Sequence, residues 1–446
     1  MNRQTHTARK RLSLALVIAL AAPGLALAQD ASPQSMEARI AQLEQLVQGL
    51  KSELEAQKAA MAAQPPAPAP LPAGTQPIQA STISPAANPG TKFSYGGFIK
   101  LDAMVTDTSD GEIADGSAGR LFYLPSATPV GGADEDSADL DMHAQFSRFW
   151  FSADTEVNGK KVKGYIEADL FGNANGNEQS TNTYGLTIRH AYVSWDKWLA
   201  GQTWSNFQDV AALPDAVDFV GPTEGTIFVR QAQLRYTNGP WSVSLENPET
   251  TVSPFLAGAR ISSDDNSVPD ATLRYLHKAD WGHFTVAGLA RQLRYETATT
   301  SESDTGFAIS VSGKWNLGAN DDLRYMVSTG SGIGRYLGFG LGSDAMQEAD
   351  GSLDALDGYG YFVAWRHAFN PKLRGNLFYS AASFDNDIGL TGGGVTKSAS
   401  SLHANLIYSP LPKIDIGAEL IYGDREIESG LDGDLRRLHL HVKYNF

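Results

Sequence analysis

The chain has 446 residues, no cysteine and a formal net charge of −15, with 35 basic against 50 acidic side chains. The lack of cysteine excludes thiol catalysis, cysteine metal sites and redox switching. A chain this acidic is not expected to bind nucleic acid through a general basic surface.

The first 28 residues have the layout of a secretory signal peptide. Four basic residues between positions 3 and 11 precede an apolar run over 12–20, and Ala26-Leu27-Ala28 is a small-residue cleavage site. A membrane anchor is the alternative, but the run is short for one. Removal would leave 31 basic against 50 acidic residues, a net charge of −19. No later segment has 18 consecutive apolar residues, so we expect an exported protein without a transmembrane helix.

Residues 35–63 are predicted to form a coiled-coil helix in the periplasm. Six apolar residues are spaced 4, 3, 4, 3 and 4 apart, namely Met36, Ile40, Leu43, Val47, Leu50 and Leu54. A lone amphipathic helix on a surface is the alternative. Some three heptads are marginal alone, so a further oligomerisation surface would be needed. Ile and Val at position a with Leu at d favour two strands. Residues 64–91 are rich in proline and predict an extended linker.

Residues 92–446 are predicted to be all-β, with sixteen strands. We expect these over 93–107, 143–157, 160–171, 185–195, 198–204, 226–237, 240–247, 269–278, 282–296, 303–317, 321–329, 358–369, 372–384, 397–409, 412–425 and 433–446. Tight links such as Asn158-Gly159 and Asn238-Gly239 alternate with long, acidic, Gly-rich gaps. That alternation is typical of a 16-stranded antiparallel transmembrane β-barrel, and a soluble sandwich has no reason to keep it.

The last strand shows the expected two faces. Leu438, Leu440 and Val442 alternate with Arg437 and His441, which predicts an apolar face toward lipid and a polar face toward the lumen. The same logic predicts a set of basic pore-lining residues: Lys100, Arg148, Arg189, Arg230, Arg235, Arg274, Arg335, Arg437 and Lys443. The phase of two of these, Arg230 and Arg335, and of Arg291, Arg294, Arg324, Arg366 and Arg374, depends on local bulges.

Two interpretations of the inward basic residues stay open. Arginines on a lumen wall attract anions and match a carboxylate in two-point geometry. Each arginine could instead pair with an inward acid such as Glu167, Asp169 or Glu246 and hold the wall together. As a set, they favour an electropositive constriction. The gap over 205–225 contains apolar residues and is predicted to fold into the lumen and narrow it; packing against the outer rim is the alternative.

The sequence gives little support to catalysis, and we predict a protein that is not an enzyme. It contains no G-x-S-x-G elbow and no H-E-x-x-H pair. The run from Gly330 to Gly342 lacks the ending of a phosphate-binding loop and is expected to be an external loop. His439 and His441 share an inward face and could suit a metal, but a basic pore wall is favoured. No cofactor or metal is predicted.

Several segments resemble the DcaP-like trimeric outer-membrane porins. These are Gly96-Gly97-Phe98-Ile99-Lys100-Leu101-Asp102, Phe122-Tyr123-Leu124-Pro125, Arg189-His190-Ala191-Tyr192, Gly201-Gln202-Thr203-Trp204-Ser205, the segments over 230–236 and 246–250, and Gly332-Ile333-Gly334-Arg335-Tyr336. The resemblance implies a sixteen-stranded homotrimeric barrel with a three-stranded periplasmic coiled coil. It also implies uptake of small anions, organic dicarboxylates among them.

The expected function is therefore an outer-membrane diffusion porin with a preference for anions. Its expected partners are small anionic solutes, outer-membrane lipid with lipopolysaccharide, and further copies of the chain. Two alternatives remain: a sugar porin, and a structural barrel tethered through its coiled coil. The acidic outer gaps could repel anions, or bind divalent cations together with lipopolysaccharide.

Overall fold

The protein is described from a computed structural model. It describes residues 45, 48–49, 51–52, 55, 90–133, 138–172, 181, 184–256 and 258–446. The chain divides into two units, Met1–Ala86 and Ala87–Phe446. The described residues between Gln45 and Glu55 are helical. The predicted signal peptide, the six seam residues of the predicted coiled coil and nearly all of the predicted linker lie outside the described residues.

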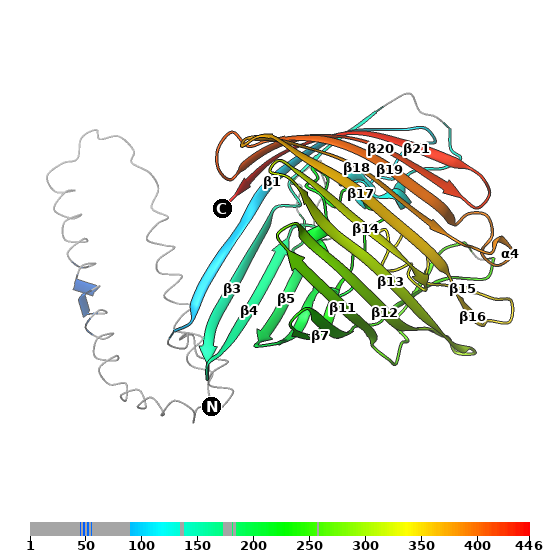
Figure 1. The fold of residues 1–446 in the computed structure, drawn as a ribbon, viewed down its shortest axis with the longest axis horizontal. Coiled ribbons are helices and arrows are strands. Elements are labelled where there is room, and N and C mark those ends of the chain that lie inside the picture. Colours follow the sequence, from blue (N-terminus) through cyan, green and yellow to red (C-terminus); the bar gives the residue numbers. More distant parts are fainter. Residues whose placement is uncertain are drawn as a thin grey trace. The chain divides into compact units, whose positions relative to one another are not determined.

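The second unit is an all-β, closed, antiparallel barrel, and its described residues contribute sixteen wall strands (Figure 1). They are β1 (Lys92–Thr108), β3 (Arg148–Val157), β4 (Lys160–Asp169), β5 (Thr187–Trp195), β6 (Trp198–Trp204), β7 (Arg230–Asn238), β8 (Trp241–Glu246), β11 (Asp270–Ala279), β12 (Gly282–Glu296), β13 (Ser301–Leu317), β14 (Asp321–Ser331), β17 (Asp357–Asn370), β18 (Leu373–Phe384), β19 (Thr396–Tyr408), β20 (Ile414–Ile427) and β21 (Asp432–Asn445). Each predicted strand overlaps one of these.

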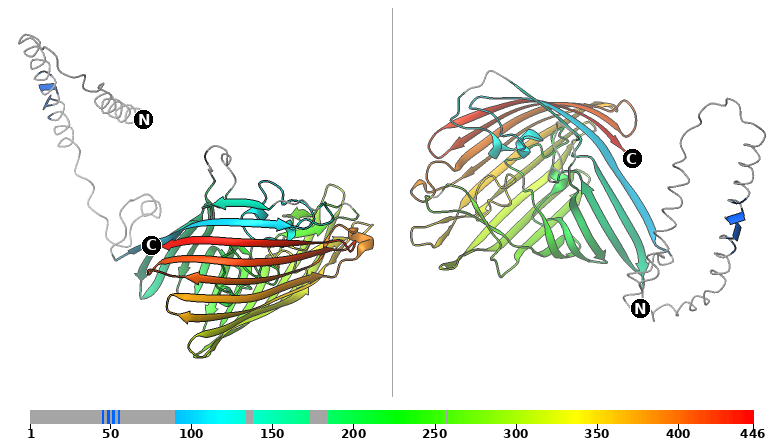
Figure 2. Two further views of the ribbon diagram at one scale, coloured as in Figure 1. Left: turned by 90° about the horizontal axis from the view of Figure 1, so that it is seen from above. Right: turned by 180° about the vertical axis from the view of Figure 1, so that it is seen from behind.

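The wall closes between the first and the last strand. β21 pairs with β1 from Phe98 opposite Asn445 to Thr108 opposite Leu435, and Figure 2 shows the two strands side by side. A short strand, β2 (Asp139–His143), continues the line of β3 along β1. No helix in the described part of the chain is long and apolar enough to cross a membrane.

The alternation of apolar and polar residues along each strand gives the barrel wall its outer and inner faces. On β21, Leu438, Leu440 and Val442 point outward and are exposed, whereas Arg437 and His441 point inward and are buried. The short turns are built from residues that tolerate left-handed backbone. Asn158 and Gly159, for example, have φ values of 51° and 72°, which suit a tight hairpin turn.

Three connections fold inside the barrel and carry many of its buried apolar residues. We call 109–133 the first inner loop, 205–229 the second and 332–344 the third. The first holds the short helices η1 (Ala118–Arg120) and η2 (Pro125–Ala127), and the second holds η3 (Val210–Ala212). Next to the third lies a small sheet of β9 (Thr250–Ser253), β10 (Ile261–Ser263), β15 (Ala345–Gln347) and β16 (Leu353–Ala355). A four-residue helix, α4 (Ile388–Thr391), follows β18.

The inner loops pack on one another and on the wall. One buried cluster joins Phe207 and Ile227 of the second loop to Ile333 and Tyr336 of the third and to Phe362 of β17. A second, aromatic cluster contains Phe122 and Phe146, with Phe219 and Phe339 packed against it. These clusters occupy part of the barrel interior.

The prediction for Gly330 to Gly342 is wrong. Ile333, Tyr336 and Leu337 are fully buried inside the barrel, so this run is not an external loop. Its apolar side chains leave water by packing on the second inner loop, and Phe228 donates its amide to the Tyr336 carbonyl at 3.0 Å.

Candidate channel constriction

The second inner loop runs along the inner wall and forms hydrogen bonds with successive strands of it. The Asn206 amide donates to Glu246 of β8 at 2.8 Å. Asp209 lies 2.9 Å from His283 of β12 and accepts from Ser312 of β13 at 3.0 Å. Further along the loop, the backbone carbonyl of Asp215 accepts hydrogen bonds from two side-chain amides of the wall, those of Asn376 on β18 and Asn405 on β19.

The tip of this loop reaches the strands that close the barrel. The Val217 carbonyl accepts from Lys100 Nζ of β1 at 2.8 Å, and the Val217 amide donates to Glu419 Oε2 of β20 at 2.6 Å. Next to it, Asp218 lies 3.6 Å from His439 of β21 and accepts from the Tyr123 amide at 2.8 Å. Burial opposes ionisation of Asp218, but these hydrogen bonds hold the pKa of its carboxyl below its usual range.

The loop then returns across the interior. Glu224 is fully buried and accepts hydrogen bonds from the Tyr123 hydroxyl at 2.6 Å and from Ser401 of β19 at 2.8 Å. Burial raises the pKa of Glu224, although both hydrogen bonds oppose this rise. The next residue, Gly225, lies so close to β17 that a Cβ would overlap the Tyr361 carbonyl. The prediction that this segment folds into the lumen is confirmed.

Basic side chains follow the inner wall near the short turns. We call this set the basic stripe: Arg235 of β7, Arg274 of β11, Lys314 of β13, Arg324 of β14, Arg366 of β17, Arg374 of β18 and Lys443 of β21. Three of its members share one carboxylate, since Arg324, Arg366 and Lys314 lie 2.7, 3.5 and 3.8 Å from Asp322. All three are only partly buried and therefore reach solvent.

Carboxylates within ion-pair distance of the stripe are fewer than its cations. Arg274 lies 3.4 Å from Asp209, Arg374 pairs with Asp215 and Asp415, and Lys443 lies 3.4 Å from Asp415. With Asp322, four carboxylates thus face seven cations. Glu246 is also near Arg235, but without an ion pair. With Glu246 counted, the stripe and the described carboxylates beside it carry two more positive than negative charges.

Most residues predicted to line the pore are paired with acids. Lys100 lies 2.7 Å from Asp102, and Arg335 lies 3.4 Å from Asp270. Arg189 lies 2.8 Å from Asp169 and 3.0 Å from Glu167, and Arg148 contacts the same two carboxylates at 3.9 and 3.4 Å. These ion pairs agree with the alternative interpretation, in which inward basic residues pair with acids and hold the wall together. Arg274 and Lys443 also pair with acids, but they belong to the basic stripe.

Three predicted pore residues have no ion pair among the described residues. Arg235 donates to the Gln233 side chain at 2.8 Å and to the Trp204 carbonyl. Arg437 is buried and donates to Thr106 and to the Gly119 carbonyl, so it anchors the first inner loop. Arg230 shares its strand phase with the outward residues Ala232 and Leu234 of β7. Its guanidinium nevertheless lies 4.9 Å from the Trp204 ring and 5.7 Å from the ring of Phe228, which packs against the inner aromatic cluster. Its role in lining the pore stays a prediction.

Neither Lys314 nor the inward course of the first inner loop was predicted from the sequence. Lys314 alternates with outward Trp315 on β13, so strand phase could have found it. For the loop, the apolar run Leu121 to Leu124 was the available signal. As for His439 and His441, His439 is bound to Asp102 at 2.8 Å. No group of three or more metal-ligating side chains is placed to hold a metal ion in the described part of the chain.

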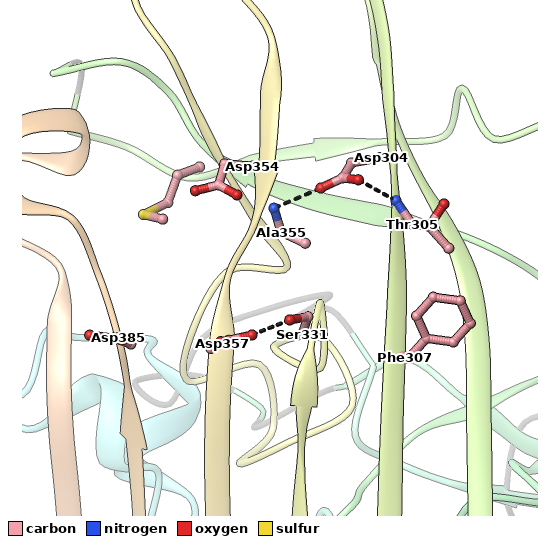
Figure 3. Close-up of a pocket in the computed structure, with 9 residues that line it drawn as sticks. Asp304, Thr305, Phe307, Ser331, Asp354, Ala355, Asp357 and Asp385 are labelled. Atoms are coloured by element: carbon pink, nitrogen blue, oxygen red, sulfur yellow. Dashed lines mark hydrogen bonds between the residues drawn. The ribbon is translucent and has the colours of Figure 1, made fainter.

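An acidic cleft lies at the long-loop end of the barrel, opposite in charge to the basic stripe. Figure 3 shows its aspartates, Asp304, Asp354, Asp357 and Asp385, on neighbouring segments. Asp304 accepts from the Ala355 amide at 2.9 Å, and Ser331 donates to Asp357. The acidic cleft and the basic stripe therefore carry opposite charges.

Comparisons with known proteins agree with this architecture. The profile of a family described as DcaP outer membrane protein matches residues 75–446. The crystal structure of the outer membrane channel DcaP of Acinetobacter baumannii is 25% identical with a TM-score of 0.67, over 81% of this chain and 99% of that chain. No curated protein matches.

Two more distant solved structures support the fold alone. An anion-selective porin from Comamonas acidovorans is 9% identical with a TM-score of 0.51, over 80% of this chain and 100% of that chain. Salmonella typhi OmpF, in a complex with daunomycin, is 13% identical with a TM-score of 0.51, over 80% of this chain and 98% of that chain.

Proposed function

The chain belongs to the DcaP outer membrane protein family and is an outer-membrane porin, and we propose that it passes small hydrophilic solutes with a preference for anions. Organic dicarboxylates are the substrates we propose to test first. The proposal treats the protein as a diffusion channel without catalytic activity. The Acinetobacter baumannii relative is itself described as an outer membrane channel.

The observation that carries this proposal is the charge of the basic stripe. Lys314, Arg324 and Arg366 share the single carboxylate of Asp322, and Arg235 has no ion pair among the described residues. Fixed positive charge on a solvated wall attracts anions and repels cations. Guanidinium groups also match carboxylates in two-point geometry, which favours dicarboxylates over simple halides.

The pairing partners of the other predicted residues limit their role. Arg148 and Arg189 face Glu167 and Asp169, so the four side chains together carry no net charge. We propose that these residues shape the wall, and that selectivity comes from the stripe and from the second inner loop beside it. The loop reaches the stripe at Arg324, which donates to the Leu213 carbonyl.

The sugar-porin and tether alternatives receive less support. A sugar porin would need a solvated slide of aromatic side chains, whereas Phe122 and Phe146 are buried in a packed cluster. A purely structural barrel has no use for surplus charge on its inner wall. Measurable conductance would separate a channel from a tether.

The assembly and the amino-terminal segment complete the proposal. We propose a homotrimer, in which residues 1–28 are a removed signal peptide, 35–63 form a periplasmic coiled coil and 64–91 link it to the barrel. Contact between barrels would supply the second oligomerisation surface that so short a coiled coil needs. The outer rim would face lipopolysaccharide.

The test removes charge from the stripe. Arg235→Gln combined with Arg366→Gln should lower the ratio of anion to cation permeability, measured as a reversal potential in planar bilayers under a salt gradient. Arg436→Gln is the control, because this exposed arginine lies outside the stripe, 3.8 Å from Asp107. An unchanged permeability ratio in the double variant would contradict the proposal.

A further inference from the structure

A second cleft at the long-loop end has the opposite charge from the acidic cleft. Its volume is about 210 Å³, and it is lined by the first and third inner loops, by Gly258 and Arg260 between β9 and β10, and by the long-loop ends of β19 and β20. The lining includes Arg260 and Arg425 but no aspartate or glutamate. We call it the mouth cleft. In a chain with 50 acidic and 35 basic residues, such a lining is unusual.

Backbone carbonyls, rather than carboxylates, hold both arginines in place. Arg260 Nη1 donates to the Gly342 carbonyl at 3.0 Å and to that of Gly340. Arg425 Nη1 donates to the carbonyls of Ser126 and Thr128, each at 3.0 Å. Neither arginine forms an ion pair with a described residue. Carbonyls fix the direction of a guanidinium without neutralising it, so both charges remain available.

Each guanidinium keeps hydrogen-bond donors for a ligand. No hydrogen bond to a described residue occupies Nη2 of Arg260 or of Arg425. The Arg260 residue is exposed and Arg425 is only partly buried. Ser343 also lines the cleft, and its hydroxyl accepts from Ser253 at 2.9 Å, which leaves its own proton free to donate.

Glycine keeps the cleft open beside Arg260. Gly340 has a φ of 73°, a conformation that other residues rarely adopt, and a Cβ there would lie 3.7 Å from Arg260 Nη2. A side chain at this position would therefore cover the donor. Gly258 and Gly394 line other parts of the cleft and have open space where a Cβ would be.

We propose that the mouth cleft is an oxyanion-binding site, in which Arg260 and Arg425 together bind a small dianion. Two guanidinium groups without an ion pair in one cleft match two negative charges. Hydrogen bonds between charged groups are also stronger than those between neutral groups. The mouth cleft would be the first place at which an entering solute is bound. This inference therefore extends the proposed function and rests on it. The same chemistry would also suit a phosphate of lipopolysaccharide, so the test includes both sources.

The test is isothermal titration calorimetry. Succinate is titrated into the full-length protein in detergent, free of lipopolysaccharide. The double variant Arg260→Gln with Arg425→Gln should bind succinate about tenfold more weakly or worse, because two charge-assisted contacts are lost. Arg436→Gln, which removes one positive charge from an exposed position outside the cleft, should bind as the unaltered protein does.

One further variant and a second probe separate the possible interpretations. Arg425→Lys keeps the charge but loses the fork geometry, so it should bind succinate with intermediate affinity. Folding of each variant is checked by circular dichroism. In a parallel arm, purified lipopolysaccharide replaces succinate. Binding of lipopolysaccharide alone, lost in the double variant, would keep the oxyanion site and assign it to a lipid phosphate.

The proposal is overturned if the folded double variant binds both probes as tightly as the unaltered protein, or if the unaltered protein binds neither. This result is distinguishable from a failure of the proposed function. Binding at the mouth cleft is measured at equilibrium without ion flow, whereas channel preference is measured as a reversal potential. A cation-preferring channel with a working mouth cleft would refute only the proposed function.

Discussion

The amide of Val217 donates a 2.6 Å hydrogen bond to Glu419, a residue 202 positions later in the chain. The same carboxylate accepts from the Asn405 side chain at 2.9 Å and lies 2.8 Å from His403. One buried side chain thus joins the tip of the second inner loop to two wall strands. This carboxylate is therefore one of the wall groups that hold the loop tip in place.

Removal of the Glu419 carboxylate should release the loop tip. We expect Glu419→Ala to destabilise the barrel by about 1–3 kcal/mol, since it leaves buried hydrogen-bonding groups without a partner. Single-channel conductance should become larger and more variable. Glu426→Ala is the control, because Glu426 forms a rim ion pair with Lys397. A conductance like that of the unaltered protein would show that the tip does not restrict flow.

The loop tip should also give the protein an acid-sensitive contribution to stability. The pKa of Asp218 is held below its usual range in the folded protein by His439 and the Tyr123 amide. Its stabilising contribution is therefore present above about pH 4, the ordinary carboxyl pKa, and is lost as the pH falls through the folded value.

The variant Asp218→Asn tests this contribution. It should be less stable than the unaltered protein at pH 7, by about 1–3 kcal/mol, and the difference should shrink as the pH falls below about 4. Urea unfolding in detergent micelles at several pH values measures both. Asp354→Asn on the rim serves as the control. A difference that stays constant with pH would exclude Asp218 as the titrating group.

Close approach of the returning loop to β17 predicts a steric effect at Gly225. A Cβ at this position would overlap the Tyr361 backbone, which cannot move without breaking the wall. We expect Gly225→Ala to cost about 1–3 kcal/mol and to alter single-channel conductance. Gly288→Ala should leave both unchanged, because nothing lies within 4 Å of the added Cβ. Equal effects of the two substitutions would contradict the close packing.

Deletion of residues 35–63 should weaken assembly more than conductance. If these residues form a coiled coil below the barrel, the shortened chain should dissociate more readily in detergent. The conductance of each remaining pore should stay the same, because the channel lies in the barrel. Native electrophoresis and single-channel recording measure the two properties. Normal assembly with lost conductance would contradict this division of roles.

Sequence predicted the barrel because a strand's two faces are a local property. The alternation of Leu438 and Leu440 with Arg437 and His439 is visible in ten residues, as are tight turns such as Asn158-Gly159. Arg230 shows the limit of this method. It begins β7 beside an inner loop, where no regular alternation precedes it to set its phase.

The candidate site was less predictable, because its charges depend on register and on long-range contacts. Asp322 faces Arg366 only because β14 and β17 pair in that register, and no local pattern shows this. The second inner loop was found through its apolar residues. Phe122-Tyr123 and Ile333 carry the same apolar signal, but strand patterns do not show which connections fold inward.

The central claim is an anion-preferring channel, and the reversal potential of the unaltered protein in a planar bilayer under a potassium chloride gradient tests it most directly. The surplus charge of the basic stripe predicts the sign that corresponds to chloride crossing more readily than potassium. The opposite sign would mean that the aspartates of the acidic cleft govern the field, and it would contradict the account.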